Sequence, residues 1–211
     1  MGTVVMSYSI FSRIIFVLLL VCAPLPASGD TVLIVGDSLS AGYGLPTGSG
    51  WVNLLSERLA DDHPDVSVIN ASISGETTAG GKRRIQALLE RHQPVVVVVE
   101  LGANDGLRGI RIPLITEDLA AIVTASRRFG ARTLVLGMRI PPNYGRDYAE
   151  KFHAMFKEVS NRHGASLVPF MLEGFADNRA LFQDDGIHPT IEAQPLILDN
   201  IYGALQRLLK D

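Results

Sequence analysis

Short apolar runs and longer amphipathic segments alternate from residue 31 to the end of the chain. The short runs have the length of strands, and apolar positions three or four residues apart predict helices. We expect strands at 31–35, 66–69, 95–99, 133–136 and 166–168. We expect helices at 51–59, 79–91, 115–128, 148–162 and 191–209.

This alternation predicts an α/β fold, because repeated strand–helix units form a parallel sheet with helices on both faces. Residues 95–99 are five consecutive valines, which is typical of a central strand buried on both faces. Right-handed crossovers then give a three-layer α/β/α sandwich. The length of 211 residues fits one such domain, which we place at 28–211.

The first 27 residues have the pattern of a secretory signal peptide. Arg13 precedes the apolar run 14–21, and small residues and prolines follow it. The run is shorter than the roughly 20 residues of a membrane-spanning helix. We expect cleavage after Ala27, with Gly29 as the alternative, and therefore an exported, periplasmic protein. Secretion is an alternative, as is lipid attachment through Cys22, although Val21 is bulkier than the residue that usually precedes a lipidated cysteine.

Composition narrows the chemistry of the mature chain. Cys22 is the one cysteine of the sequence, so cleavage removes it and excludes disulfides, cysteine nucleophiles and thiolate metal sites. Loss of Arg13 leaves 18 Lys and Arg against 22 Asp and Glu, a net charge of −4. Such a chain has no overall attraction to phosphate backbones, and the basic cluster 82–84 fits a solvated helix face. We therefore expect no nucleic-acid partner.

Two short segments contain the residue types of an activated hydroxyl nucleophile. Ser38 follows the first predicted strand, and His188 lies near the C-terminus three residues after Asp185. In such a group a base takes the serine proton and a carboxylate orients the base. Ser38 also suits a helix N-cap. Its surroundings are not the G-x-S-x-G elbow, because Gly36 and Ser40 occupy the glycine positions.

His188 differs from the other four histidines in its local sequence. Gly186 favours a turn and Pro189 stiffens the segment, so Asp185 can be held against the imidazole ring. Asp184 is an alternative orienting carboxylate. Glu150 precedes His153 at the same spacing, but on a helix this fits an exposed pair. The histidines without such a segment are His63, His92, His153 and His163.

Acyl transfer also requires donors directed at a developing oxyanion. Gly75 can bring a bare backbone N–H close to a substrate, and Asn104 offers a side-chain amide. The backbone N–H of Ser38 is the third candidate. Gly75 alone also fits a plain turn, and Asn104 alone a loop cap. Ser38, Gly75, Asn104 and the His188 loop nevertheless all fall at the carboxyl ends of the predicted strands, where open α/β sheets bind ligands.

Together these segments resemble the SGNH/GDSL hydrolase superfamily. The similar blocks are 36–43, 70–77, 100–108 and 188–189 with 193–195, and the resemblance covers essentially the whole mature chain. They look most like the branch of the periplasmic acyl-CoA thioesterase/lysophospholipase and the arylesterases. Glu76 and Ala103 depart from it, since relatives often have Asp and Gly there.

The resemblance implies a flavodoxin-like order of five parallel strands and neither metal nor cofactor. It implies nucleophile Ser38, base His188 oriented by Asp185, and oxyanion donors Ser38, Gly75 and Asn104. We expect a serine esterase or thioesterase that hydrolyses aryl and short-to-medium-chain acyl esters or thioesters through an acyl-Ser38 intermediate. Lysophospholipids are a further substrate class suggested by the resemblance.

Two loops are candidates for the walls of an acyl groove. Residues 106–113 mix apolar side chains with two glycines, and we expect this loop to move when substrate binds. Residues 141–145 form the expected opposite wall. The predicted groove residues are Leu107, Ile110, Ile112, Pro141 and Tyr144.

Three other functions remain open from sequence. A carbohydrate acetylesterase belongs to the same superfamily, and a doubly wound fold can be a non-catalytic binding domain. A metal-dependent phosphoesterase would gather Asp37, Asp105, Asp185 and His188, although a two-metal site needs more ligands. The sequence does not determine the oligomeric state.

Overall fold

The computed structural model describes residues 1–3 and 29–210. Apart from residues 1–3, the expected signal peptide lies outside the described residues, and with it Cys22 and the cleavage point after Ala27. Within the described residues, no helix combines the length and the hydropathy that a membrane crossing requires.

Five parallel strands form one sheet in the order β2-β1-β3-β4-β5, the flavodoxin-like order that was predicted. Neighbouring strands are in register at Val32 with Val68 on one side and Val96 on the other, and at Val98 with Leu134. The strands are β1 (Asp30–Gly36), β2 (Val66–Asn70), β3 (Val96–Glu100), β4 (Arg132–Leu136) and β5 (Ser166–Val168).

The central strand is β3, as the run of valines predicted. All five of its residues are buried, because helices cover both faces of the sheet. The strand begins one residue later than expected, at Val96, and ends on a charged residue, Glu100. A carboxyl group therefore closes the most buried strand of the molecule.

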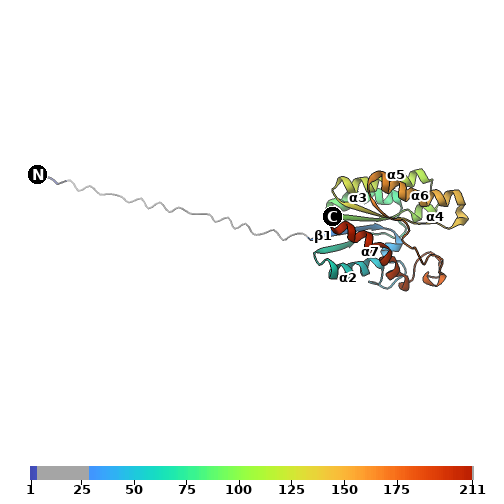
Figure 1. Ribbon diagram of the computed structural model, residues 1–211. Coiled ribbons are helices and arrows are strands. Elements are labelled where there is room, and N and C mark those ends of the chain that lie inside the picture. Colours follow the sequence, from blue (N-terminus) through green and yellow to red (C-terminus); the bar gives the residue numbers. More distant parts are fainter. Residues whose placement is uncertain (4–28, 211) are drawn as a thin grey trace.

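Five long helices complete the three layers (Figure 1). Two lie on one face of the sheet, α2 (Trp51–Asp62) and α7 (Gln194–Lys210). Three lie on the other face, α3 (Thr78–His92), α5 (Ile112–Arg128) and α6 (Arg146–His163). Trp51 is fully buried, and its backbone N–H donates a 3.0 Å hydrogen bond to the Gln194 side chain, which joins α2 to α7.

Two boundaries differ from expectation in ways that matter for the site. Helix α5 begins at Ile112, three residues earlier than predicted, because Pro113 occupies the first turn, where no backbone N–H is needed. The last predicted helix is divided into the 3₁₀ turn η3 (Ile191–Ala193) and α7.

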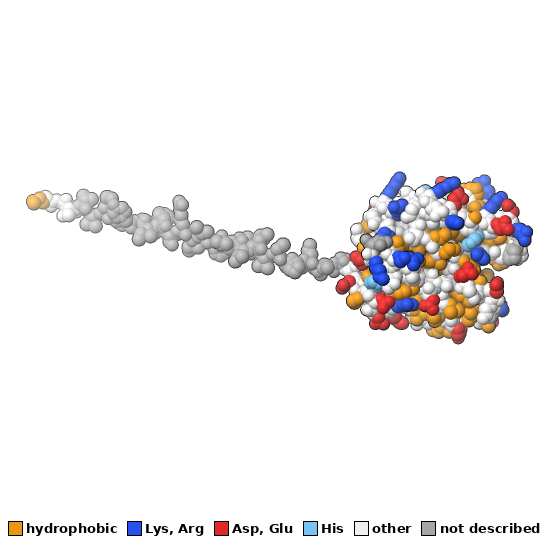
Figure 2. All heavy atoms as spheres, in the orientation of Figure 1, with side chains coloured by type: hydrophobic (Ala, Val, Ile, Leu, Met, Phe, Trp, Pro, Cys, Tyr) orange, Lys and Arg blue, Asp and Glu red, His pale blue; other side chains and the backbone are white. Residues whose placement is uncertain are grey.

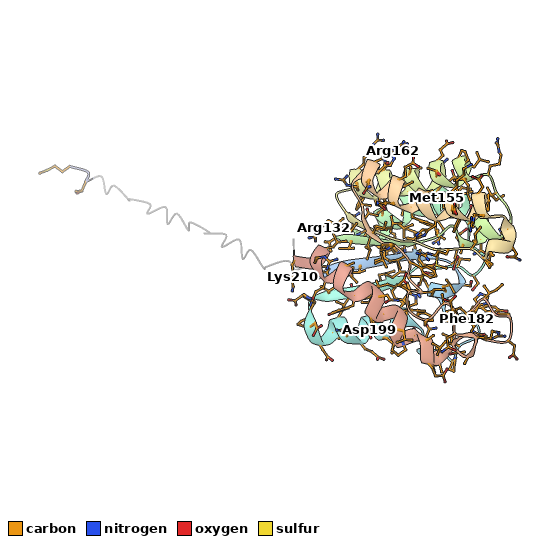
Figure 3. The ribbon with its side chains drawn as sticks, turned by 45° about the vertical axis from the view of Figure 1, so that its right-hand side comes forward. Arg132, Met155, Arg162, Phe182, Asp199 and Lys210 are labelled. Atoms are coloured by element: carbon orange, nitrogen blue, oxygen red, sulfur yellow. The ribbon has the colours of Figure 1, made fainter. Side chains whose placement is uncertain are left out.

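Short elements that the sequence pattern did not predict lie at the carboxyl ends of the strands. They have too few residues for a periodic pattern, being α1 (Ser38–Ala41), α4 (Ala103–Leu107), η1 (Pro142–Tyr144) and η2 (Arg179–Leu181). Figure 3 places Phe182, just after η2, at the opposite end of the molecule from Arg132, where β4 begins. The candidate residues therefore gather at the end of the molecule where the strands finish.

Candidate active site

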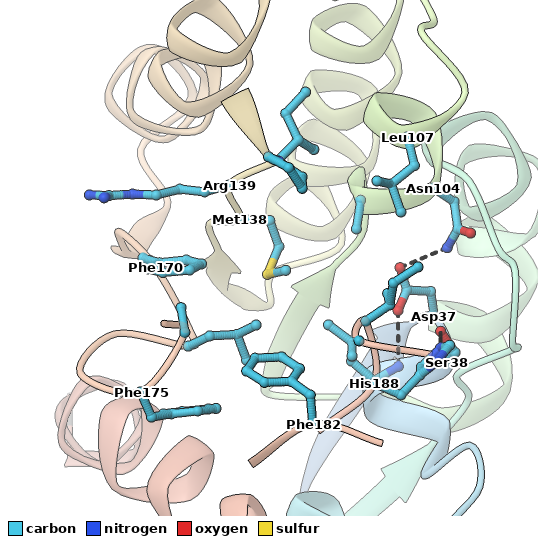
Figure 4. A pocket seen from close by; sticks show the side chains of 18 of the residues that line it. Asp37, Ser38, Asn104, Leu107, Met138, Arg139, Phe170, Phe175, Phe182 and His188 are labelled. Atoms are coloured by element: carbon cyan, nitrogen blue, oxygen red, sulfur yellow. Dashed lines mark hydrogen bonds between the residues drawn. The ribbon is translucent and has the colours of Figure 1, made fainter. Parts of the chain in front are cut away.

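Ser38, His188 and Asp185 form a hydrogen-bonded chain at the carboxyl edge of the sheet (Figure 4 shows Ser38 and His188). The Ser38 Oγ lies 2.9 Å from His188 Nε2, and His188 Nδ1 lies 2.7 Å from Asp185 Oδ2. Although 150 residues separate the serine and the histidine, the structure brings together the three residues singled out from sequence. The alternative Asp184 does not occupy this position, since the carboxylate beside the ring is that of Asp185.

Asp185 is held in its ionised form. Partial burial raises the pKa of this carboxyl, but hydrogen bonds from the backbone N–H and the ring of His188 and from the Ile187 N–H outweigh that effect. Together they lower the pKa to about 2. The carboxylate is therefore negatively charged at neutral pH, and its Oδ2 can accept a hydrogen bond from the protonated Nδ1 of the imidazole.

Backbone hydrogen bonds fix the loop that presents His188. Gly186 has a φ of 71°, the left-handed region that favours glycine, and it makes the turn between Asp185 and the histidine. The His188 carbonyl accepts a 2.8 Å hydrogen bond from the Gln183 N–H. The Gln183 side chain then donates to the Tyr43 carbonyl, and the Tyr43 ring lies 4.5 Å from the imidazole, centroid to centroid. The His188 loop and the loop after α1 thus support each other.

The other histidines have different environments. His153 Nδ1 lies 3.3 Å from the Met138 carbonyl, and His163 Nδ1 lies 3.1 Å from the Thr124 hydroxyl. His63 and His92 belong to the end of α2 and to α3, at the other edge of the sheet. Within the described residues, His188 alone among the histidines hydrogen-bonds Ser38.

Three N–H groups are available near the serine. Ser38 opens α1, whose N-cap is Asp37, and Gly75 lies in the loop after β2 with a φ of 78°. Across the described residues, neither of these backbone N–H groups has a protein acceptor. The Asn104 amide donates one hydrogen to Asp37 Oδ2 at 2.9 Å, which leaves its second hydrogen for a ligand (Figure 4).

The Gly75 loop is anchored from two sides. Arg108 donates to the Gly75 carbonyl at 3.2 Å, and Glu76 forms an ion pair of 2.8 Å with Arg84. Glu76, one of the two departures noted in the sequence, lies over Gly80, where a Cβ would be 1.6 Å from the carboxylate. The longer acid is therefore accommodated by a glycine in α3.

Ala103, the second departure, opens α4. The backbone turn at the end of β3 is made by the preceding residue, Gly102, which has a φ of 118°. Since Gly102 supplies this conformation, Ala103 can adopt ordinary helical geometry ahead of Asn104.

A cavity of about 1040 Å³ opens beside Ser38 and His188. Met138, Phe170 and Phe182 form an apolar wall in Figure 4, with Phe175 below them. Most of this wall comes from residues 170–182 in the segment between β5 and α7, a stretch that the sequence interpretation did not assign to the site. The sequence does contain a signal for this wall, because residues 170–182 are rich in apolar side chains that follow neither the period of a strand nor that of a helix.

The expected groove residues are only partly on this cavity. Leu107 and Pro141 line it, whereas Ile110, Ile112 and Tyr144 do not. Ile112 starts α5 and packs against the core, and the exposed Ile110 gives its carbonyl to the Tyr148 hydroxyl. Because α4 and α5 take up half of 106–113, the expected mobile wall is reduced to the connection 108–111.

The carboxylates considered for a metal site point to different partners. Asp105 accepts hydrogen bonds of 3.0 and 2.7 Å from the Thr78 N–H and hydroxyl, so it joins α4 to α3. Asp37 is engaged by Leu39 and Asn104, and Asp185 by His188. In the part of the chain that the structure describes, no three His, Cys, Asp or Glu side chains converge as metal ligands.

This fold and this arrangement of serine, glycine, asparagine and histidine match a known class of acyl hydrolase. Residues 34–194 match the model of the GDSL-like Lipase/Acylhydrolase family. The chain belongs to this family.

Curated relatives cover most of the chain. It is 48% identical over 183 residues to the esterase TesA of Pseudomonas aeruginosa, and the aligned residues cover 87% of this chain and 91% of that protein. It is 42% identical over 183 residues to thioesterase 1/protease 1/lysophospholipase L1 of Escherichia coli, covering 87% of this chain and 86% of the relative. It is 41% identical to an arylesterase of Vibrio mimicus over 82% of this chain and 86% of the relative.

Solved structures of esterases have the same fold as this chain. The crystal structure of TesA superposes with a TM-score of 0.83 at 47% identity and covers 85% of this chain and 99% of that one. The esterase EstA of Pseudoalteromonas sp., in a structure inhibited by monoethylphosphonate, superposes with a TM-score of 0.82 at 43% identity. It covers 86% of this chain and 100% of its own.

Proposed function

We propose that the protein hydrolyses carboxylic esters and thioesters of hydrophobic acyl or aryl groups through an acyl-Ser38 intermediate. The observation that carries this proposal is the chain from Ser38 through His188 to Asp185 at the mouth of an apolar cavity. In this proposal His188 Nε2 takes the serine proton, and Asp185 stabilises the imidazolium that forms; the 2.9 Å separation of Nε2 and Ser38 Oγ supports it.

The reaction then proceeds in two halves. Ser38 Oγ attacks the acyl carbon while its proton passes to His188, and His188 returns that proton to the leaving oxygen or sulfur. In the second half, His188 takes a proton from water, the water attacks the acyl-enzyme, and the proton returns to Ser38. The N–H groups of Ser38, Gly75 and Asn104 are the proposed donors to the oxyanion that forms in each half.

The surroundings of the cavity favour a hydrophobic substrate. Its wall contains Phe170, Phe175 and Phe182. In the described residues after Met1, every exposed large hydrophobic side chain lies between the carboxyl end of a strand and the first turn of the next long helix. These side chains are Tyr43, Ile73, Ile110, Leu114, Tyr144, Ile187, Ile191 and Leu196. The names of the relatives, esterase, arylesterase and thioesterase/lysophospholipase, support the same substrate range.

We further propose that residues 1–27 are a signal peptide and that 28–211 act in the periplasm as one domain. The pattern of Arg13, the apolar run 14–21 and the small residues after it supports this. N-terminal sequencing of the protein from the periplasmic fraction should find Ser28 first. An uncleaved N-terminus in the cytoplasmic fraction would contradict the proposal, and a lipidated Cys22 would replace it.

The function is tested with matched octanoyl oxyester and thioester substrates and the protein comprising residues 28–211. Replacement of Ser38 by alanine should abolish turnover of both substrates, while Ser56→Ala, an exposed serine on α2, should leave it unchanged. The ratio of the two wild-type rates then says whether the enzyme is mainly an esterase or a thioesterase.

Two results would contradict this function. If Ser38→Ala retained the wild-type rate, the serine mechanism would be wrong. If neither substrate were turned over and a fluorophosphonate did not label Ser38, a non-catalytic binding domain would be the better interpretation. Labelling without turnover would instead point to acylated sugars as substrates.

A further inference from the structure

Glu100 takes no part in the proposed reaction, although it hydrogen-bonds residues near Ser38 in the chain. It is the last residue of the central strand β3, and its side chain is fully buried. A buried carboxyl group is costly unless it is neutral or well paired. The position of Glu100 at this edge of the sheet therefore needs an explanation.

One oxygen of Glu100 holds the segment around the nucleophile. Its Oε2 accepts a 2.8 Å hydrogen bond from the Ser40 hydroxyl and a 3.2 Å hydrogen bond from the Asp37 N–H. The fit is close, because a Cβ on Gly36 would lie 2.9 Å from Oε2 and 2.7 Å from Ser40 Oγ. Ser40 and Asp37 flank Ser38, so Glu100 contacts both sides of the serine from below.

In the described part of the chain, the second carboxyl oxygen of Glu100 lacks a hydrogen-bond donor. Glu100 Oε1 is buried, and no N–H or O–H donor reaches it within the described residues. A negative charge on Glu100 would thus be incompletely paired. A protonated Oε1 would instead be a donor, and the acceptor we assign to it is the carboxylate of Asp37, the residue whose backbone N–H already contacts Glu100.

The two carboxyl groups differ in what surrounds them. Asp37 Oδ1 accepts from the Leu39 N–H at 3.0 Å and Oδ2 from the Asn104 amide at 2.9 Å, and His188 lies close enough to favour its negative charge. Burial, and then the charge of Asp37, hold the pKa of Glu100 well above its usual range. Burial also raises the pKa of Asp37, but these hydrogen bonds oppose the rise. One proton shared by the pair therefore resides on Glu100.

We propose that Glu100 is a positioning residue that, as a neutral carboxylic acid, fixes Asp37 and through it the Asn104 amide, and through Ser40 fixes the turn that presents Ser38. This inference rests on the proposed ester-hydrolase function. Asp37 in turn holds one hydrogen of the Asn104 amide, so the direction of the other is set. Because Glu100 is neutral, only one negative charge lies behind the oxyanion donors, where a second would oppose the developing oxyanion.

Two substitutions at Glu100 separate this role from packing alone. Glu100→Gln reproduces the neutral acid, since its amide can donate to Asp37 while its oxygen accepts from Ser40, and we expect kcat within about 3-fold of wild type. Glu100→Leu keeps comparable volume without the hydrogen bonds. We expect it to lower kcat at least about 10-fold, part of the 10²–10³-fold effect of losing an oxyanion donor, with KM changed less than about 2-fold.

The matched control is Thr133→Val on the adjacent strand β4, which removes a buried hydroxyl that has no partner in the described residues. It should leave kcat unchanged. The rate at which a p-nitrophenyl phosphonate labels Ser38 should fall in parallel with kcat in Glu100→Leu, because the labelled adduct has the tetrahedral geometry of the transition state. If Glu100→Leu does not fold by circular dichroism, Glu100→Asp replaces it, with the same group withdrawn by one methylene and the same expected loss.

The proposal is overturned if Glu100→Gln loses as much kcat as the Leu or Asp variant, since an ionised Glu100 would then be required. It is also overturned if the Leu and Asp variants keep the wild-type kcat. Neither result affects the serine mechanism, which fails only if Ser38→Ala retains activity. The two failures are therefore distinguishable in the same assay.

Discussion

At the scale of single residues, the site depends on hydrogen bonds that orient groups rather than on unusual residue types. Asp185 holds His188, Asp37 holds Asn104, and Glu100 lies beneath Asp37 and Ser40. In each case a carboxyl group accepts a hydrogen bond that orients a neighbouring group of the candidate site. In the proposed mechanism, Ser38 therefore relies on a set of acidic residues that do not themselves attack the substrate.

Asn104 provides the most direct test of the oxyanion donors. Asn104→Ala should lower kcat by about 10²–10³-fold with little change in KM, because the donor acts mainly on the charge that develops in the transition state. Steady-state kinetics with an octanoyl ester measures this effect. Asn161→Ala, an exposed asparagine on α6, is the control and should match wild type. A loss of less than about 3-fold in Asn104→Ala would remove Asn104 from the oxyanion hole.

The raised pKa of Glu100 predicts a dependence of stability on pH. Above its ordinary value of 4.5, Glu100 ionises in the unfolded chain but stays protonated in the fold, so the free energy of unfolding falls as pH rises. The slope is at most about 1.4 kcal/mol per pH unit. Glu100→Gln removes this group, so its stability relative to wild type should increase with pH. Urea unfolding from pH 5 to 8 measures the difference, and a constant difference would contradict the raised pKa.

At the scale of secondary-structure elements, the loops at the carboxyl ends of the strands form the site and are held by the helices behind them. The loop after β3 is shortened by α4 and by the early start of α5. The segment between β5 and α7 instead contributes the largest part of the cavity wall. Helix α7 supports that wall through Asn200, whose amide donates to the Met171 and Glu173 carbonyls at 3.1 and 2.9 Å.

Asn200→Ala should therefore loosen the cavity wall without touching the serine. We expect the free energy of unfolding to fall by about 1–3 kcal/mol for the two lost hydrogen bonds. We also expect KM for an octanoyl ester to rise more than KM for an acetyl ester, since only the longer chain needs the wall. Gln206→Ala on the same helix is the control. Equal changes in both KM values would mean that the 170–175 segment does not contact the acyl chain.

At the scale of the whole molecule, stability and reactivity belong to different ends. The core is continuous around β1 and β3, while the exposed large hydrophobic side chains of the described residues after Met1 lie at the carboxyl edge of the sheet. Figure 2 shows acidic and basic side chains interspersed over the visible face, with hydrophobic side chains among them. The sheet therefore supports the site without taking part in it.

Val98→Ala, in the middle of β3, should separate the two properties. The Val98 side chain is fully buried, and its truncation should lower the free energy of unfolding by about 2–3 kcal/mol through lost burial and a residual cavity. At a temperature where the variant is folded, kcat should stay within about 2-fold of wild type. Thermal unfolding and kinetics on one preparation test both statements. A large loss of kcat in a fully folded variant would show that the sheet interior controls the site.

The sequence by itself determined the alternation of strands and helices, because the hydrophobic period of each long element is local. The central place of β3 also followed from local information, since five successive valines suit a strand covered on both faces. Ser38 and His188 could be selected because short motifs accompany them. The resemblance to a known family then predicted the strand order and the residues that the structure brings together.

Only the tertiary structure decided which long-range contacts complete the site. The five-residue helix α4 and the wall from 170–182 have no periodic pattern, so Ile110, Ile112 and Tyr144 were placed on the groove and Phe170, Phe175 and Phe182 were missed. Glu100 ends a valine strand, but its meeting with Asp37 and Ser40 requires parallel strands and a close turn at Gly36. Such contacts join residues far apart in the chain. Their energy depends on burial and direction, which the order of residues does not specify.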